Sequence, residues 1–196
     1  MPIARFDWDW GLPYLESGPE SPMAQQFEEA IAEHLAGRPN GALWGWKHPH
    51  SYLLLPFLRE RFPEMRFIHV VRDGRDIALS DNQQQARHYG ALLQRPDEPG
   101  PVRSAAWWAW ANLRAQDTGG SLGNDYLVMR LEDLCADPAA SIQRVLEFSG
   151  GEDDGTLRSE ITRPRSLGRW HGCDGALVRK IEGACGDALR RFGYVC

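Results

Sequence analysis

The sequence lacks long hydrophobic runs, cysteine motifs and an excess of positive charge. No apolar stretch approaches the roughly 18 residues that a membrane-spanning helix needs, and the N-terminal segment has no basic part leading into an apolar part, as a secretory signal would. We therefore expect a cytoplasmic protein without a membrane span. The four cysteines form no C-x-x-C pair, which argues against a metal site. A net charge of −5 argues against a large nucleic-acid-binding surface.

The residues that are present are typical of a soluble globular domain. The chain has 196 residues, of which 42% are hydrophobic and 25% are charged. At roughly 100–200 residues per domain, this length predicts a single α/β domain over residues 21–196, preceded by a loop segment over residues 1–20. Lysine is scarce, since only Lys47 and Lys180 among the 22 lysines and arginines are lysine. A lysine beside candidate site residues is therefore worth attention.

Strand-like and helix-like segments alternate along the chain. Short β-branched and apolar runs predict strands at 42–47, 66–71 and 126–134. Apolar periodicity and capping residues predict helices at 22–37 and 51–61, after Asp73, at 103–117, after Pro138 and at 175–192. This alternation predicts an α/β domain in which helices flank a parallel sheet.

The strongest local signal is the strand-to-helix turn FIHVVRDGRDIALS. Arg72 ends the strand at the edge where parallel sheets bind ligands, and Asp73 is placed to cap the following helix. Ser80, seven positions past Asp73, would return to the same face of that helix about 10 Å along it. The arginine and the hydroxyl could then hold one phosphate from two sides. The same spacing also fits a second interpretation, in which these charged residues form a helix cap and surface ion pairs.

Several segments resemble the sulfotransferase family, and they occur in the family's order. The family's 3′-phosphate-binding segment is similar to FIHVVRDGRDIALS, and its Lys-x-Pro strand end with the following helix is similar to WGWKHPHSYLLLPFLRERFP. The late strand and helix are similar to YLVMRLEDLCADPAASIQRVLEFSG, the closing cofactor loop to RPRSLGRWHG, and the typical C-terminal segment to FGY. The resemblance is to bacterial members and covers roughly residues 42–194. It implies a P-loop-NTPase-like fold and the sulfuryl donor 3′-phosphoadenosine 5′-phosphosulfate (PAPS).

The resemblance also implies which residues bind the donor. Arg72 and Ser80 match the residues that hold the 3′-phosphate. The closing loop that covers the same phosphate contributes Arg163, Arg165, Gly168 and Trp170. For Trp170, a role as a simple core anchor is also open.

The catalytic roles implied by the resemblance fall on the segment KHPH. Lys47 would stabilise the negative charge that develops on the donor oxygen as the sulfuryl group leaves. His48 or His50 would act as the base that takes the proton of the acceptor. The family places one residue between the lysine and the histidine, so His48 comes one position early and His50 one position late. A capping or surface role therefore remains open for both histidines.

The sequence departs from the family at two places. The family's 5′-phosphosulfate loop, of the form P-K-S-G-T-T or G-x-x-R-S-G-T, has no counterpart, because no SGT, GKS or GKT occurs. Leu131 stands where many members carry tyrosine near the adenine. We therefore expect a P-loop-like, three-layer parallel sheet that is truncated at its N-terminus relative to the family. The truncation would reflect a start upstream of Met1, a short variant that binds nucleotide weakly or not at all, or a partner chain that completes the sheet.

Two functions follow from these observations. The first is transfer of a sulfuryl group from PAPS, without a metal, to the hydroxyl or amine of a small-molecule or glycan acceptor. The second is a non-catalytic or fragmentary sulfotransferase-fold module that binds nucleotide weakly or needs a partner chain. A sheet without its central strand would expose unpaired backbone, so a homo-oligomer or a partner covering the sheet is a further expectation. A nucleotide kinase is disfavoured, because the sequence has no Walker loop.

Overall fold

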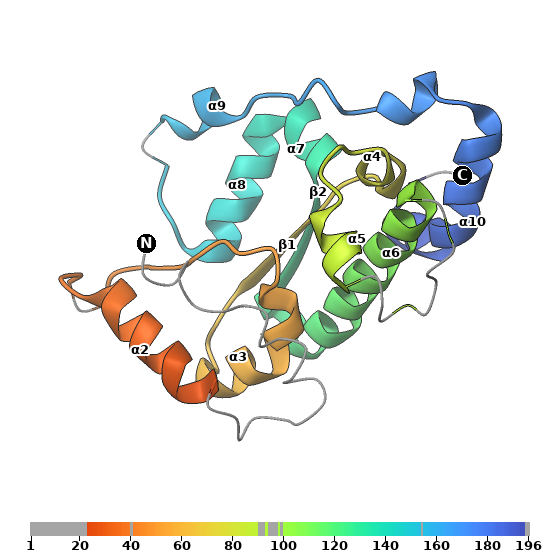
Figure 1. Cartoon of the computed structure of the whole chain (residues 1–196). Helices are drawn as coiled ribbons and strands as arrows, with labels where there is room; N and C mark the ends of the chain where they lie inside the picture. The colour runs from red at the N-terminus through yellow and green to blue at the C-terminus, as the bar shows by residue number, and fades with distance from the viewer. Residues whose placement is uncertain are drawn as a thin grey trace. The chain divides into compact units, whose positions relative to one another are not determined.

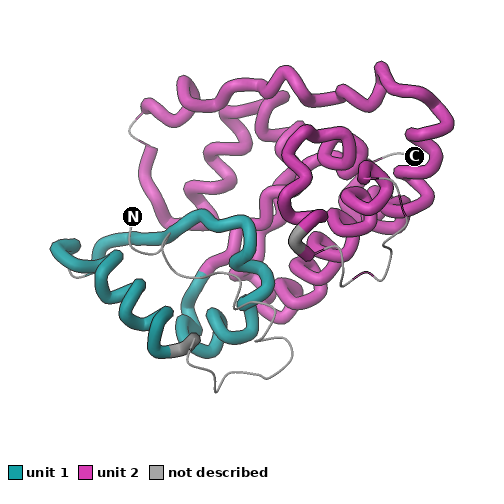
Figure 2. The backbone as a smooth tube through the Cα atoms, in the orientation of Figure 1, with its two compact units in different colours: residues 1–65 teal, residues 66–196 magenta. Residues whose placement is uncertain are grey.

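The chain divides into two compact units, residues 1–65 and residues 66–196 (Figure 2). The computed structural model describes residues 23–39, 41–89, 93, 98, 100–153 and 155–194. The loop predicted for residues 1–20 lies outside the described residues. The single domain expected over residues 21–196 stays a prediction.

The first unit contains the two helices predicted for it. Helix α2 spans Met23–Leu35, where the sequence predicted 22–37. The segment predicted at 51–61 begins as the 3-10 helix η3 (Ser51–Leu54) and continues as α3 (Leu55–Arg61). Pro56 lies in the first turn of α3, where its missing N–H costs no helical hydrogen bond. The buried apolar residues of this unit that pack together are Phe27, Ile31, Leu54, Phe57 and Leu58.

The strand predicted at 42–47 is wrong, because these residues form no strand. A strand needs a neighbouring strand, and the described part of this unit contains none. Trp44 and Trp46 instead stack with their ring centroids 5.8 Å apart, and both meet the ring of Phe62 edge-on. The short apolar run that predicted a strand therefore belongs to an aromatic cluster.

The second unit is built around two parallel strands, as Figure 1 shows. Strand β1 spans Phe67–Val71 and β2 spans Tyr126–Arg130, with Phe67 opposite Tyr126 and Val71 opposite Arg130. The strand at 66–71 is thus confirmed, and the fold is mixed α/β and mostly helical. In the described residues the sheet has these two strands, fewer than the predicted sheet.

Helices connect the strands and follow them. Between β1 and β2 lie α4 (Gly74–Ala78), α5 (Gln84–Tyr89), α6 (Gly100–Gly119) and η5 (Gly120–Asp125). After β2 lie α7 (Leu131–Ala136), α8 (Pro138–Ser149), α9 (Leu157–Glu160), η6 (Arg169–Gly172) and α10 (Gly175–Arg191). The helices predicted at 103–117, after Pro138 and at 175–192 are confirmed.

The second strand ends earlier than predicted. The sequence predicted a strand over 126–134, whereas β2 stops at Arg130 and the segment LEDL begins α7. Glu132 and Asp133 lie in the first turn of α7. Carboxylates are stabilised there by the free N–H groups and the positive end of the helix dipole.

The core of the second unit lies where α4, α6 and α10 meet one face of the sheet. Val71 of β1, Trp108 of α6 and Leu189 of α10 belong to one buried cluster. Gly74, at the start of α4, lies directly on the indole of Trp108. A Cβ at this position would come within 2.4 Å of Trp108 Cε3. Only glycine therefore lets α4 sit this close to α6.

Replacing Gly74 tests this packing. The change Gly74→Ala should lower the free energy of unfolding by about 1–3 kcal/mol, because the added methyl group overpacks the Trp108 contact. Gly183→Ala is the matched control, since Gly183 lies in α10 with open space around it. The control should raise stability by roughly 0.5–1 kcal/mol through helix propensity. Urea unfolding measures both, and equal effects of the two changes would contradict the packing.

A buried histidine links the strands to α6. His69 of β1 is 8% exposed, and its Nε2 lies 2.8 Å from Asn112 Oδ1 while its Nδ1 lies 2.7 Å from the Tyr126 hydroxyl. Because an amide oxygen only accepts, Nε2 donates, and Nδ1 of the neutral ring accepts from the tyrosine. Burial lowers the pKa of His69, against a smaller upward effect of the Asn112 hydrogen bond. The neutral ring is thus the form that the fold stabilises.

The buried neutral histidine predicts acid sensitivity. The folded-state pKa of His69 lies below its ordinary value of 6.5, so the unfolded chain binds more protons in the window below pH 6.5. The contribution of His69 is complete above pH 6.5 and is lost as the pH falls toward the folded-state pKa. Urea unfolding between pH 5 and 8 should show this loss in the wild type and a flatter profile in His69→Gln. Parallel pH profiles for the two proteins would contradict the assignment.

Candidate functional site

The turn after β1 is a buried charge cluster. Asp73 caps α4 as predicted, with its Oδ1 accepting from the backbone N–H of Arg75 at 2.9 Å. The Arg75 guanidinium folds back on the Asp73 carboxylate, with an Nη2–Oδ2 distance of 2.8 Å, and donates to Glu182 of α10 at 2.9 Å. Asp73 and Arg75 are 6% and 3% exposed. The cap and ion-pair interpretation therefore holds for these two residues, but the pair lies in the interior.

Arg72 makes a different set of contacts. Its Nη2 donates to Asp76 Oδ2 at 3.0 Å and to the backbone carbonyl of Ser166. The Nε atom of Arg72 is buried and has no hydrogen-bond partner in the described residues. A buried donor without an acceptor costs free energy. Arg72 is thus anchored through one end of its guanidinium, and its Nε–H lacks an acceptor.

Asp76 joins this turn to a distant loop. Its carboxylate is 1% exposed and accepts from the backbone N–H of Gly168 at 2.7 Å and of Trp170 at 3.3 Å, in addition to Arg72. Gly168 has a φ of 77°, a conformation that favours glycine, and the 3-10 turn η6 begins directly after it. The closing loop predicted from RPRSLGRWHG therefore lies against the end of β1.

Two arginine contacts add to this attachment. Arg169 Nη1 donates to the carbonyl of Leu79 at 2.9 Å. The Arg75 guanidinium lies over the Trp170 ring, 3.7 Å from its centroid, a cation–π contact. Trp170 is half-buried beside this cation, not enclosed in an apolar core as the core-anchor interpretation would have it.

Ser80 does not lie on the helix as predicted. Helix α4 ends at Ala78, and the amide of Gln83 bonds the carbonyl of Ala78. The backbone N–H of Ser80 donates to Ile77 at 3.0 Å, and its hydroxyl accepts from the N–H of Asn82. The expectation that Ser80 returns to the same helical face is therefore wrong, because the side chain of Gln83 takes up a carbonyl at the end of α4.

Arg163 and Arg165 lie on the closing loop and are exposed. The structure thus brings Arg72 together with the backbone of Ser166 and Gly168, and it places the two arginines on the same loop. Their role toward a phosphate stays a prediction.

The predicted catalytic residues all belong to the first unit. Lys47 is exposed and follows the aromatic segment 42–46, so it does not end a strand as expected. His48 Nδ1 accepts from the backbone N–H of His50 at 3.3 Å, and the two rings meet edge-on with centroids 5.2 Å apart. The segment therefore presents a cation and two adjacent imidazoles just before η3.

Sequence reasoning assigned no role to Glu132, although it lies in the quoted RLEDL segment. Its Oε1 accepts from the backbone N–H of Asp73 at 3.0 Å, and its Oε2 accepts from the Tyr194 hydroxyl at 2.7 Å. Burial and the Glu132 carboxylate raise the pKa of Tyr194. Glu132 therefore connects the end of β1 to the C-terminal FGY segment. Asp76 was also missed as a site residue, although its four-residue spacing from Arg72 is a readable signal.

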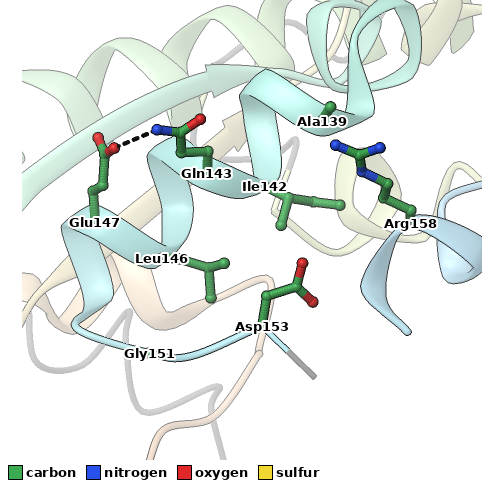
Figure 3. A pocket seen from close by; sticks show the side chains of 8 residues that line it. All are labelled: Ala139, Ile142, Gln143, Leu146, Glu147, Gly151, Asp153 and Arg158. Carbon is green, nitrogen blue, oxygen red and sulfur yellow. Dashed lines mark hydrogen bonds between the residues drawn. The ribbon is translucent and has the colours of Figure 1, made fainter. Parts of the chain in front are cut away.

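A separate hollow of about 410 Å³ lies beside α8 (Figure 3). Gln143 and Glu147 on its wall share a hydrogen bond of 2.8 Å. None of the residues predicted for the site lines it. Its lining residues are Ala139, Ile142, Gln143, Leu146, Glu147, Gly151, Asp153 and Arg158.

Comparison with protein-family models gives a match to the sulfotransferase family over residues 15–154, more than half of the chain. The chain belongs to the sulfotransferase family. The matched range includes Lys47, the two histidines and the turn from Arg72 to Ser80, and it ends before the closing loop. The recognition from sequence is thus confirmed.

Two further comparisons, with curated proteins and with solved structures, give no significant match. No helix among the described residues is long and apolar enough to cross a membrane. The described residues also contain no group of histidine, cysteine and carboxylate side chains that could hold a metal ion.

Proposed function

We propose that this member of the sulfotransferase family binds PAPS and transfers its sulfuryl group to a hydroxyl or an amine of a small acceptor. Family membership supports the chemistry and a P-loop-like fold. The observation that carries the proposal for this chain is Arg72. It lies at the end of β1, is held in place by Asp76 and Ser166, and keeps a buried Nε–H without an acceptor.

The residues around Arg72 fit the 3′-phosphate of the donor. A phosphate dianion accepts charge-assisted hydrogen bonds, and arginine is well suited to supply them. Arg163 and Arg165, exposed on the loop that Asp76 holds, supply two further cations to this half of the site. Gly168 shapes that loop, Trp170 packs beside Arg75, and the hydroxyl of Ser80, whose oxygen accepts from Asn82, keeps its O–H as a further donor.

The first unit supplies residues suited to the transfer itself. The sulfur–oxygen bond to the donor's phosphate breaks as a bond forms between sulfur and the acceptor oxygen or nitrogen. His48 or His50 takes the proton released by the acceptor. Lys47 stabilises the negative charge left on the 5′-phosphate of 3′-phosphoadenosine 5′-phosphate (PAP). These roles require no metal.

One observation favours a second function. The sequence has no 5′-phosphosulfate loop, so the half of the donor that reacts has fewer recognisable partners than the 3′ half. A protein with only the 3′ half would bind PAP without transferring a sulfuryl group. The two functions differ in turnover, and the second binds the nucleotide weakly or needs a partner chain.

Calorimetry with PAP tests the donor site. The wild type should bind PAP, and Arg72→Ala should weaken binding about 10- to 150-fold, corresponding to about 1.5–3 kcal/mol for a hydrogen bond to a charged group. Arg87→Ala is the matched control, because Arg87 is an exposed arginine of α5. It should leave the affinity unchanged. A folded wild-type chain that does not bind PAP would refute the proposal.

Turnover separates the two functions. PAP release from PAPS, measured with a phenol, an alcohol and an amine as acceptors, should be detectable in the wild type. Lys47→Ala should lower kcat much more than it lowers PAP affinity, because the lysine acts on charge that develops during transfer. Lys180→Ala, at the other lysine of the chain, is the control. Equal losses of kcat and affinity would contradict the role of Lys47, and PAP binding without turnover would favour the second function.

A further inference from the structure

We propose that Asp76 is the positioning residue of the donor site, which holds both Arg72 and the closing loop in the geometry that accepts a phosphate. The role in phosphate binding rests on the proposed function. The attachment of the loop to Asp76 stands on the described hydrogen bonds alone.

The carboxylate of Asp76 has its charge compensated inside the protein. It is 1% exposed and accepts three hydrogen bonds, from the Arg72 guanidinium and from the N–H groups of Gly168 and Trp170. An ionised carboxylate in the interior is tolerated only when it is paired and hydrogen-bonded. These three donors come from the strand end and from a loop more than 90 residues away, so the carboxylate determines where the two segments meet.

The neighbouring side chains make different contacts, whereas Asp76 bonds both Arg72 and the loop backbone. Arg75 is committed to Asp73 and Glu182, and it reaches the loop only through the face of Trp170. Arg169 bonds backbone carbonyls and not Arg72. Loss of the Asp76 charge would therefore loosen both the loop and the guanidinium, with only the Arg72–Ser166, Arg169–Leu79 and Arg75–Trp170 contacts left to attach the loop.

Electrostatics and geometry make opposite predictions for the loss of this charge. An aspartate next to a phosphate site repels the phosphate, so its neutralisation alone would tighten anion binding. If Asp76 instead positions Arg72 and the loop, its neutralisation weakens anion binding in spite of the more favourable charge. The sign of the change in PAP affinity therefore separates the two roles.

The variant Asp76→Asn provides this test. It keeps the shape of the side chain, but its NH₂ group faces the donors that the carboxylate accepted. We expect PAP affinity, measured by calorimetry on the full chain, to fall at least 10-fold. Unchanged or tighter PAP binding would overturn the proposal. Asp187→Asn, an exposed aspartate of α10 paired with Arg190, is the charge-matched control and should leave PAP affinity unchanged.

Limited trypsin digestion reads the loop without nucleotide. Cleavage after Arg165 and Arg169 should be faster in Asp76→Asn than in the wild type, whereas Arg163 is protected by the following proline. Unchanged cleavage would overturn the attachment of the loop to Asp76. If the wild type fails to bind PAP but the variant is cleaved faster, the donor function fails while the attachment of the loop holds.

A second variant covers the case in which Asp76→Asn does not fold. Gly168→Ala strains the loop at its positive φ without changing any charge. It should reproduce the faster cleavage and the weaker PAP binding. Gly150→Ala, at another positive-φ glycine after α8, is the strain-matched control. Equal behaviour of the two glycine variants would overturn the proposal.

Discussion

Carboxylates at the turn after β1, the buried Asp73 and Asp76 together with Glu132 of α7, join the segments of the second unit. Asp73 pairs with Arg75, Asp76 accepts from the loop at Gly168, and Glu132 accepts from the N–H of Asp73. The hydrogen bonds that connect this turn to Glu132 and to Gly168 join residues 59 and 92 positions apart. Burying such charges is costly unless each one is paired. The folded unit therefore requires these distant segments to lie against one another. The turn is therefore both a structural junction and the frame of the candidate site.

The arginines of this junction divide their work. Arg75 uses its guanidinium nitrogens and one face for internal contacts, with Asp73, Glu182 and the Trp170 ring. Arg72 is held by a single nitrogen and keeps its Nε–H without an acceptor. Arg75 is thus used by the fold, and Arg72 is the arginine proposed to bind a phosphate. The net charge of −5 does not conflict with the proposed anion site, because that site depends on local charge and not on the net charge.

Much of the second unit was readable in the sequence because its signals are local. The β-branched run at 66–71, the Asp73 cap and the apolar periodicity of α8 and α10 each depend on neighbouring residues only. The strand predicted at 42–47 is wrong because a short apolar run does not show whether a partner strand or an aromatic cluster covers it. The helical position predicted for Ser80 is wrong because α4 ends at Ala78, whose carbonyl accepts a hydrogen bond from the side chain of Gln83.

Only part of the candidate site could be predicted from the sequence. Family motifs indicated Arg72 and the closing loop, and the structure places these two together. The same motifs did not indicate that Asp76 joins Arg72 to the loop or that Glu132 joins the end of β1 to Tyr194, because spacing alone does not distinguish a buried ion pair from an exposed one. Only the three-dimensional arrangement shows that Arg75 is 3% exposed. An exposed ion pair would contribute little to stability.

The contacts of Arg75 also limit which residues position 75 can tolerate. A lysine carries the same charge but presents a single ammonium, which cannot grip Asp73 with two nitrogens, reach Glu182 with a third and cover an indole ring at once. On an exposed surface the exchange of arginine for lysine changes stability little. At Arg75 the same exchange would remove these contacts. At this position, the presence of arginine and not lysine thus has a stereochemical reason.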